Sequence, residues 1–378
     1  MLAVLGFRVP LCAAAMVATA AAVGVPSATE VGRSDLCGNC HRDIYRMWRS
    51  SQHARSLDDL VFLGAYRETR RTQGESVSRI CLGCHAPAVD INGDETLQLQ
   101  STWEGVSCDV CHSLASVETT SGGAKPVYRV SEVKRGPIRG AESTGHETLF
   151  SELHTDSLAC APCHEFANPE GIPLLTTYSE WRQSSSARGG MSCQSCHMAR
   201  TRANVVDPVV KRVPEKEVNL HEMTGGHSIK QLNNAIRMTI TPRRSGDELF
   251  LDVELRNKGA GHAVPTGMPG RRLVLNVKLQ GKGTPIEERR SYEKSYATAS
   301  GERIERDSAF FGRGVKFVSD TRIQADEVRK ERLRFPLPGR ETGFLSVKLS
   351  YEHAPTGGEE DRTWITFLTE ERILSPGK

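Results

Sequence analysis

The sequence predicts an α+β fold, in which a mostly α-helical or irregular N-terminal domain is followed by an antiparallel β-sandwich domain. Two observations divide the chain. Ten of the eleven cysteines lie between Cys37 and Cys196, in a region with many Gly and Ser residues and only short helical stretches. From about residue 233, apolar and polar residues alternate in short runs separated by Gly, Pro and charged turns, which is typical of an antiparallel sandwich. The predicted boundaries are 1–28, 29–232 and 233–378.

The strands of the C-terminal part are predicted from runs in which apolar residues recur at every second position. The clearest runs cover residues 237–240, 249–255 and 273–279, and further candidates cover 331–335, 344–351 and 363–368. The cysteine-rich part has no long apolar periodic segment. Something other than side chains is therefore expected to fill its core.

The first residues have the features of a secretory signal peptide, predicted within 1–28. Residues 1–25 carry a single charge, Arg8, and an apolar run leads to the small residues before a cleavage site after Ala22. Cys12 would be removed with this segment. The positive charge is sparse, so the alternative is an uncleaved membrane anchor. Either way, we expect the chain to be periplasmic or extracellular.

The amino-acid composition is that of a soluble globular protein and argues against nucleic-acid binding. The 378 residues suffice for two domains, and 25% charged with 38% hydrophobic residues is ordinary for a soluble globular protein. The net charge is only +3, aromatic residues make up 6%, and no long basic run occurs. Nucleic acid is therefore not an expected partner.

The motif Cys-x-x-Cys-His occurs five times, and it indicates covalently bound haem c. Two thiols add to the vinyl groups of a haem, and the adjacent imidazole ligates the iron. The haem-binding cysteines are predicted to be Cys37 and Cys40, Cys81 and Cys84, Cys108 and Cys111, Cys160 and Cys163, and Cys193 and Cys196. The proximal ligands are predicted to be His41, His85, His112, His164 and His197.

Zinc ribbons and redox disulfides are the alternatives to haem. Zinc sites of this kind pair two Cys-x-x-Cys units, which five units cannot do completely, and neither alternative explains why His follows every second cysteine. The sequence therefore predicts five haems. Because so little protein separates the motifs, we also expect a continuous chain of haems.

Five irons need five further ligands for complete bis-histidine ligation, and twelve histidines less the five proximal ones leave seven. His53 is the leading candidate. Residues 41–53 look helical, with Tyr45 and Trp48 placed to pack on haem faces. The two ends of a straight helix of this length lie about 18 Å apart. If the helix is straight, His53 ligates a different iron from His41.

Four more candidates lie near or after the fourth motif. His146 and His154 shortly precede it, and each is as compatible with a surface position as with ligation; His146 is favoured. His221 and His227 flank two glycines that would let the backbone approach a haem closely. At least one of this second pair is expected to be a ligand.

His262 lies in a Gly- and Pro-rich loop between two predicted strands, and such a loop can present a side chain rigidly to another domain. A plain turn is the alternative. His353 has no supporting context and is expected at the surface. Met198 and Met223 are conceivable iron ligands, but there are enough histidines without them.

Arg271 and Arg272 follow the His262 loop. They are predicted either to pair with haem propionates or to begin a solvated strand.

The segment from Cys37 to His53, in which the motif is followed by Tyr, Trp, Ser and His-Ala, resembles the opening of the cytochrome c-554-type multihaem proteins. Residues 104–108, 178–181 and 193–198 are similar to other segments of the same group, so the resemblance covers about residues 35–230. It implies that His53 is a distal ligand. This sequence departs from cytochrome c-554 in having five motifs instead of four.

Residues 261–267, 320–322 and 335–338 look like the β-domain fused to some multihaem cytochromes. In those proteins the loop histidine contacts the haem domain, which supports His262 as a ligand. The family's role in hydroxylamine oxidation is not transferred, because cytochrome c-554 lacks this domain.

Three functions remain open. The first is an electron carrier whose redox partners are other cytochromes or quinol-oxidising or terminal reductase complexes. The second is a reductase of a small oxyanion such as nitrite, with one haem open at its sixth position; all five motifs end in His, whereas pentahaem nitrite reductases carry Lys at the catalytic haem. The third is a subunit of a larger cytochrome assembly. Whether the chain is an enzyme in its own right stays undecided at this stage.

Overall fold

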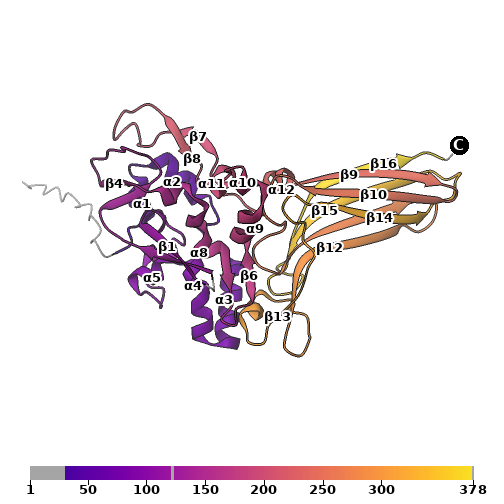
Figure 1. Ribbon diagram of the computed structural model, residues 1–378, viewed down its shortest axis with the longest axis horizontal. Helices are drawn as coiled ribbons and strands as arrows, with labels where there is room; N and C mark the ends of the chain where they lie inside the picture. The colour runs from indigo at the N-terminus through magenta and orange to yellow at the C-terminus, as the bar shows by residue number, and fades with distance from the viewer. Residues whose placement is uncertain (1–29, 121–122, 377–378) are drawn as a thin grey trace, which may run out of the picture.

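The computed structural model describes residues 30–120 and 123–376. The predicted signal peptide, the cleavage site after Ala22 and Cys12 lie outside the described residues. Figure 1 shows a rounded N-terminal part, drawn in indigo to magenta, and an elongated C-terminal part of long strands, drawn in orange to yellow. The α+β class and the order of its two kinds of structure are thus confirmed.

Short helices connected by irregular segments make up most of the N-terminal part. The α-helices are α1 (Ser34–Gly38), α2 (Arg42–Arg49), α3 (Leu60–Gln73), α4 (Glu75–His85), α5 (Ala88–Asn92), α6 (Gln100–Trp103), α7 (Cys108–His112), α8 (Ala161–His164), α9 (Thr177–Gln183), α10 (Ser185–Arg188), α11 (Cys193–His197) and α12 (Ile229–Ala235). Two 3₁₀ turns, η1 (Glu152–Thr155) and η2 (Ser157–Cys160), precede α8. No helix within the described residues is long and apolar enough to cross a membrane.

Short strands also occur in this part, and sequence analysis did not predict them. They are β1 (Leu114–Thr120), β2 (Gly123–Tyr128), β3 (Val133–Gly136), β4 (Glu147–Phe150), β5 (Glu165–Ala167), β6 (Pro173–Thr176), β7 (Arg200–Ala203) and β8 (Lys216–Asn219). They form a four-stranded sheet, β1-β2-β5-β6, and two-stranded ribbons. None is longer than seven residues, which leaves little period-two signal.

Apolar side chains form only small clusters in the N-terminal part. One gathers around Leu57, Tyr66 and Leu82, and another around Val31 and Val110. For a region of this size such clusters are small beside the cores of ordinary domains. This agrees with the expectation that side chains alone do not fill the core.

The C-terminal part is a sandwich of two antiparallel sheets. Its strands are β9 (Ile236–Ser245), β10 (Glu248–Asn257), β11 (Arg271–Gln280), β12 (Ile286–Ala297), β13 (Lys316–Asp320), β14 (Val328–Pro336), β15 (Gly343–His353) and β16 (Thr363–Leu374), with a 3₁₀ turn η3 (Asp307–Phe311). One sheet has the order β14-β10-β9 and the other β13-β12-β11-β15-β16. All six predicted runs fall within strands.

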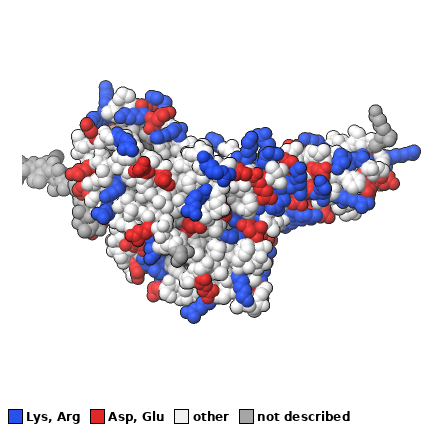
Figure 2. Space-filling view, in the orientation of Figure 1, with Lys and Arg blue, Asp and Glu red and all other residues white. Residues whose placement is uncertain are grey.

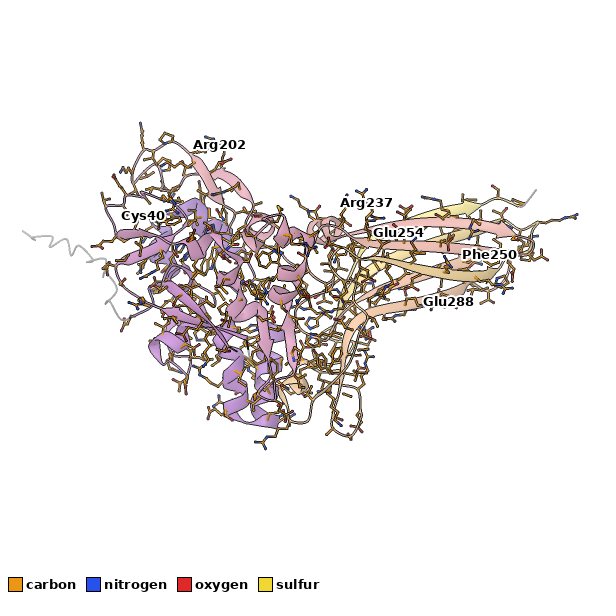
Figure 3. All side chains as sticks on the ribbon, viewed as in Figure 1. Cys40, Arg202, Arg237, Phe250, Glu254 and Glu288 are labelled. Atoms are coloured by element: carbon orange, nitrogen blue, oxygen red, sulfur yellow. The ribbon has the colours of Figure 1, made fainter. Side chains whose placement is uncertain are left out.

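The core of the sandwich follows from alternation along its strands. In β10, Leu249, Leu251, Val253 and Leu255 are buried while their neighbours face outward, because successive side chains of a strand point to opposite faces. Figure 3 shows the outward set, in which Phe250 and Glu254 of β10 project from the surface of the sandwich. The inward residues of both sheets form one continuous cluster.

The two parts are joined by polar contacts. In α3, Glu68 pairs with Arg306 at 2.7 Å and accepts from Ser308 Oγ at 3.0 Å. Farther along the interface, Lys294 Nζ of β12 donates to Pro173 O at 3.2 Å. Such contacts hold the end of the sandwich against the cysteine-rich part.

Candidate haem sites

Each Cys-x-x-Cys-His motif lies in or next to a single helical turn. The second is the last turn of α4, the third is α7 and the fifth is α11, while the first spans α1 and the start of α2 and the fourth spans η2 and α8. Residues three apart on a helix lie on the same side. Both thiols of a motif can therefore reach one edge of a haem, and the following histidine emerges beside them.

Most of the motif histidines have one ring nitrogen tied to a backbone carbonyl. The Nδ1 contacts are His41 with Val205 O at 2.5 Å, His85 with Ser56 O at 2.7 Å, His112 with Arg135 O at 2.5 Å and His197 with Thr224 O at 2.8 Å. A carbonyl can only accept, so Nδ1 carries the proton and Nε2 is free to bind a metal. Histidines that ligate metals are oriented in this manner.

Four motif histidines each face a second histidine, and the distance between the two ring centroids is similar in all four pairs. The ring centroids are 6.0 Å apart for His41 and His146, 6.3 Å for His164 and His53, 5.8 Å for His112 and His154, and 6.4 Å for His197 and His262. Metal–imidazole bonds of about 2 Å put two rings on opposite sides of one metal atom at about this separation. The residues present therefore fit bis-histidine ligated haem at four motifs.

The second histidine of each pair also has a nitrogen available. His146 and His262 engage backbone carbonyls through Nδ1, and His53 Nδ1 lies 2.8 Å from Met223 Sδ, which leaves Nε2 in all three. His154 is reversed: Nε2 contacts Cys111 O at 2.9 Å, and its buried Nδ1 has no partner among the described residues. An unpaired buried nitrogen is rare in proteins, and a metal ion would satisfy it.

Burial keeps three of these imidazoles neutral. It lowers the pKa of His53 and of His112 to about 4, and that of His164 to about 3. Neighbouring histidines contribute to each of these shifts after burial. The neutral imidazole is the form that donates electrons to a metal.

Local packing explains how His53 reaches the fourth motif. The helix expected over residues 41–53 ends earlier, because α2 stops at Arg49 and a turn leads to His53. His53 accordingly faces His164 and not His41. Tyr45 packs on Gly38 of the first motif, where an added Cβ would lie 2.7 Å from the ring, and Trp48 Nε1 donates to Val106 O at 2.9 Å.

The second motif differs from the other four. Phe62 stacks on the His85 ring with centroids 3.8 Å apart, and no histidine in the described chain forms a ring pair with His85. His221 and His227 form no pair with any motif histidine either. His221 Nδ1 contacts Asn219 O at 2.6 Å, and His227 lies edge-on to Tyr351 at 5.8 Å. Their assignment as iron ligands stays a prediction.

One expectation about the remaining histidine was wrong. His353 was expected at the surface, but it is 7% exposed, and its Nε2 lies 2.9 Å from Asp307 Oδ2. It ends β15, which is paired on both sides by β11 and β16, so its side chain is enclosed. The residues on either side of His353 in the sequence do not indicate that it lies in a central strand.

The arginines after the His262 loop have different surroundings. Arg272 donates two hydrogen bonds to the buried Glu352, at 2.9 and 2.7 Å, so it is neither solvated nor free. Arg271 donates through Nη1 to Thr266 O at 3.1 Å, and its buried Nε has no partner among the described residues. Sequence reasoning did not single out Tyr351, whose buried hydroxyl is also unpaired.

Part of the chain matches a known protein family. Residues 36–113 match the family described as cytochrome c554 and c-prime, and this segment contains three of the five motifs. The segment with the first three motifs therefore resembles a multihaem c-type cytochrome. No curated protein matches it.

A solved structure has a similar fold over almost the whole chain. It is a penta-heme cytochrome c552 from Thermochromatium tepidum, which shares 24% sequence identity and superposes with a TM-score of 0.71. The alignment covers 92% of this chain and 100% of that one. The similarity therefore includes the C-terminal sandwich as well as the segment with the motifs.

Proposed function

We propose that this cytochrome transfers electrons along five covalently bound haems, with His146, His53, His154 and His262 as distal ligands of the first, fourth, third and fifth motifs. Bound haem would supply reversible one-electron exchange at each iron. The observation that carries the proposal is that different motifs lie against one another, with their thiols close together. Because each thiol is the attachment point of a haem edge, neighbouring edges would also lie side by side.

Three such contacts connect the motifs. Cys37 lies near Cys108, Cys84 near Cys163, and Cys160 near Cys193, so that each thiol shifts the pKa of the other. Cys84 Sγ also lies 3.9 Å from Pro162 O of the fourth motif. These contacts lower the pKa of Cys37, Cys84 and Cys193 and raise that of their partners.

Polar bonds hold the same motifs together. Cys108 N donates to Ser34 Oγ, just before the first motif, at 3.3 Å, and Cys193 N donates to Ser157 Oγ, just before the fourth, at 2.9 Å. Backbone N–H groups of two motifs are thus bonded to serines that precede the neighbouring motifs, which holds the motifs close together.

These contacts imply an order of transfer. They link the first motif to the third, and the fourth motif to the second and fifth. Cys111 of the third motif lies near Cys160 and Cys163, since its charge contributes to raising both pKa values, after the contact with the partner thiol and burial. The proposed chain therefore runs from the first motif through the third to the fourth, where it branches.

The accessible ends of this chain are the proposed contact points for redox partners. Cys40 of the first motif and Cys196 of the fifth, at two ends of this chain, are exposed, as is Cys111 of the third motif. The other described cysteines are half-buried. Figure 3 places Cys40 in the N-terminal part, far from the sandwich. Figure 2 shows a largely uncharged face on that part and densely mixed charges along the sandwich. We propose that partners such as other cytochromes dock on the cysteine-rich part, in the periplasm or outside the cell.

Counting haems tests the proposal directly. Intact-mass measurement and a haemochrome assay of the mature protein should give five haems per chain. The variant Cys193→Ser with Cys196→Ser should give four, and Ser195→Ala in the same motif should keep five. A wild-type protein with fewer than five haems contradicts the proposal, as does a potentiometric titration in which one haem exchanges no electrons with the rest.

A second candidate function is reduction of a small oxyanion at the haem of the second motif. It is favoured by one observation: among the described residues no histidine forms a ring pair with His85, whereas each of the other four motif histidines has one. An iron there would have an open sixth position. Low-temperature EPR of the ferric protein should then show one high-spin haem per chain. If all five irons are low-spin, this function is excluded, and loss of one low-spin signal in His227→Ala would identify His227 as the fifth distal ligand.

A further inference from the structure

We propose that the loop between β7 and β8, residues 204–215, forms together with α2 the docking surface through which the haem of the first motif exchanges electrons with an acidic redox protein. This surface rests on the proposed electron-transfer function, because it needs a haem at the first motif. That function leaves open where a partner binds and which charge it carries, and both follow from the contacts and charges of this loop.

Hydrogen bonds hold the β7–β8 loop against the first motif. Asp207 N donates to Cys40 O at 2.7 Å, and His41 Nδ1 contacts a backbone carbonyl of the same loop at 2.5 Å. Asn204 donates to Asp43 Oδ2 of α2 through its backbone N at 3.1 Å and through Nδ2 at 3.0 Å. Because the Cys40 thiol is exposed, the loop lies beside the accessible edge of the proposed haem.

The loop presents two adjacent apolar side chains to solvent. Val209 is 87% exposed and Val210 is 55% exposed. The buried Asp207 fixes their backbone, since Oδ1 accepts from Val209 N at 2.8 Å and the carbonyl accepts from Val210 N at 2.8 Å and from Lys211 N at 3.0 Å. Arg42 in turn pairs with the Asp207 carboxylate at 2.8 Å. Single exposed valines are common, but a hydrogen-bonded turn that displays two of them beside a haem-attachment motif fits a contact surface.

The surroundings of the two valines are positively charged. Residues 42–49 and 200–217 together contain eight Lys and Arg but only four Asp and Glu, an excess of four positive charges, whereas the whole chain has an excess of three. Lys211 and Arg212 follow the valines directly, are exposed, and form no ion pair in the part of the chain that the structure describes. A protein with carboxylates around an apolar centre would complement this surface and would be attracted to it.

A membrane with anionic lipids would also attract a basic surface. Segments that lie in a membrane interface insert Trp, Phe or Leu, whereas the side chains that project here are two valines. Figure 3 places Cys40 and Arg202 of β7 in the N-terminal part, away from the sandwich, so the sandwich does not cover this surface. A redox protein is therefore the partner that fits, because its small interface would bring it to the exposed edge of the haem.

The experiment follows by stopped flow how fast the ferric holoprotein is reduced by two probes, each at low and at high ionic strength. The first probe is the hydroquinone of an acidic flavodoxin, which gives one electron to a ferric iron and becomes the semiquinone. The second is the neutral semiquinone of free riboflavin, which gives one electron, loses a proton and becomes oxidised riboflavin. The small uncharged flavin reports whether the haems can be reduced, and only the flavodoxin reports docking.

The double variant Lys211→Glu with Arg212→Glu should be reduced by flavodoxin about tenfold more slowly at low ionic strength, because it reverses the charge beside the valines. This difference should shrink at high ionic strength, where salt screens the charges. Val209→Ser with Val210→Ser should slow flavodoxin by a smaller factor at both ionic strengths, since it removes apolar contact and no charge. Reduction by the riboflavin semiquinone should be unchanged in both variants.

The matched control is Lys282→Glu with Arg340→Glu. It makes the same change in net charge on exposed loops of the sandwich, between β11 and β12 and between β14 and β15. Both probes should reduce this control as fast as wild type.

Three results would overturn the proposal in different ways. If flavodoxin reduces the Lys211→Glu, Arg212→Glu variant as fast as the control, the docking surface is wrong while the electron-transfer function stands. If that variant keeps the wild-type flavodoxin rate but loses binding to phosphatidylglycerol vesicles, the surface is a lipid contact. If the riboflavin semiquinone fails to reduce the wild-type protein, or the haem count is below five, the proposed function itself fails.

Discussion

The ring of His262 lies 6.4 Å from that of His197, with an angle of 16° between their planes, although the two residues belong to different parts of the molecule. His197 ends α11 beside Cys193 and Cys196, and His262 projects from the loop between β10 and β11. The loop is held in place by Glu180 of α9, which accepts from Ala263 N at 3.1 Å. Glu180 also pairs with Arg322, whose side chain is 5% exposed. A buried ion pair thus fixes the loop that carries His262, the ligand we propose for the fifth motif.

Replacing His262 should change the ligation of the fifth motif alone. In His262→Ala we expect one low-spin signal to disappear and one high-spin signal to appear in the EPR spectrum, with the haem count unchanged. His262→Met is the matched control: it keeps a donor atom, should stay low-spin, and should raise the reduction potential of that haem. A low-spin spectrum identical to wild type in His262→Ala would contradict the assignment.

Gly259 is the point at which the same loop passes α12 most closely. An added Cβ would collide with the carbonyl oxygen of Asn234, which is backbone and cannot move aside cheaply. Gly259→Ala should therefore lower the free energy of unfolding by about 1–3 kcal/mol, the usual cost of overpacking. Gly283→Ala, where nothing lies within 4 Å, should change it by less than about 0.5 kcal/mol. Equal denaturant midpoints for the two variants would show that the loop moves to accommodate the added methyl group at no cost in stability.

The sequence was sufficient to predict the motifs, because the chemistry of haem attachment requires adjacent residues at fixed spacing. It also identified His53, His146, His154 and His262 as candidates. Which motif histidine each one faces was not predictable, because those pairings join residues up to 111 positions apart, as for His53 and His164. Only the folded backbone brings them together.

The strands were predictable where one face is apolar. β12 was missed because its inward positions include Lys294 between Tyr292 and Tyr296, so the run reads as charged. His353 was misplaced for a related reason, since its burial depends on being in a central strand with Asp307 as partner. Polar residues that are buried through specific partners leave no hydrophobic pattern.

Glu352 should make the sandwich sensitive to acid. Burial alone would raise its pKa, but the guanidinium groups of Arg272, Arg362 and Arg289 outweigh burial and lower it below the ordinary 4.5. The ionised carboxylate therefore stabilises the fold above about pH 4.5, and this contribution is lost as the pH falls through the lower folded-state pKa. Acid unfolding followed by circular dichroism should show this loss.

The variant Glu352→Gln isolates the effect. It leaves three arginines without their shared anion, so the free energy of unfolding at pH 7 should fall by about 3 kcal/mol. Below pH 4.5 the difference from wild type should shrink. Glu287→Gln is the control, because Glu287 is 67% exposed and its pair with Lys278 contributes little. A difference that stays constant with pH would mean that Glu352 acts by packing alone.

Lys294 should produce a pH dependence of the same sign, but at high pH. Its ammonium is enclosed between the two parts of the molecule, where Nζ donates to Pro173 O at 3.2 Å and to Thr176 Oγ1 at 3.1 Å. Burial, followed by the charge of Arg322, lowers its pKa from 10.5 to about 8. Between these values the unfolded chain binds the proton more tightly than the folded one, so the free energy of unfolding should rise with pH, by about 3 kcal/mol in total.

In Lys294→Met this rise between pH 8 and pH 10.5 should be absent, because the neutral side chain does not titrate. The measurement is the urea midpoint at a series of pH values for the wild type, Lys294→Met and Lys278→Met. Lys278 is 50% exposed on β11, and its removal should leave the wild-type rise in place. A rise that persists in Lys294→Met would have to come from another group, since the loss of one buried ammonium at this interface is the only change between the two proteins.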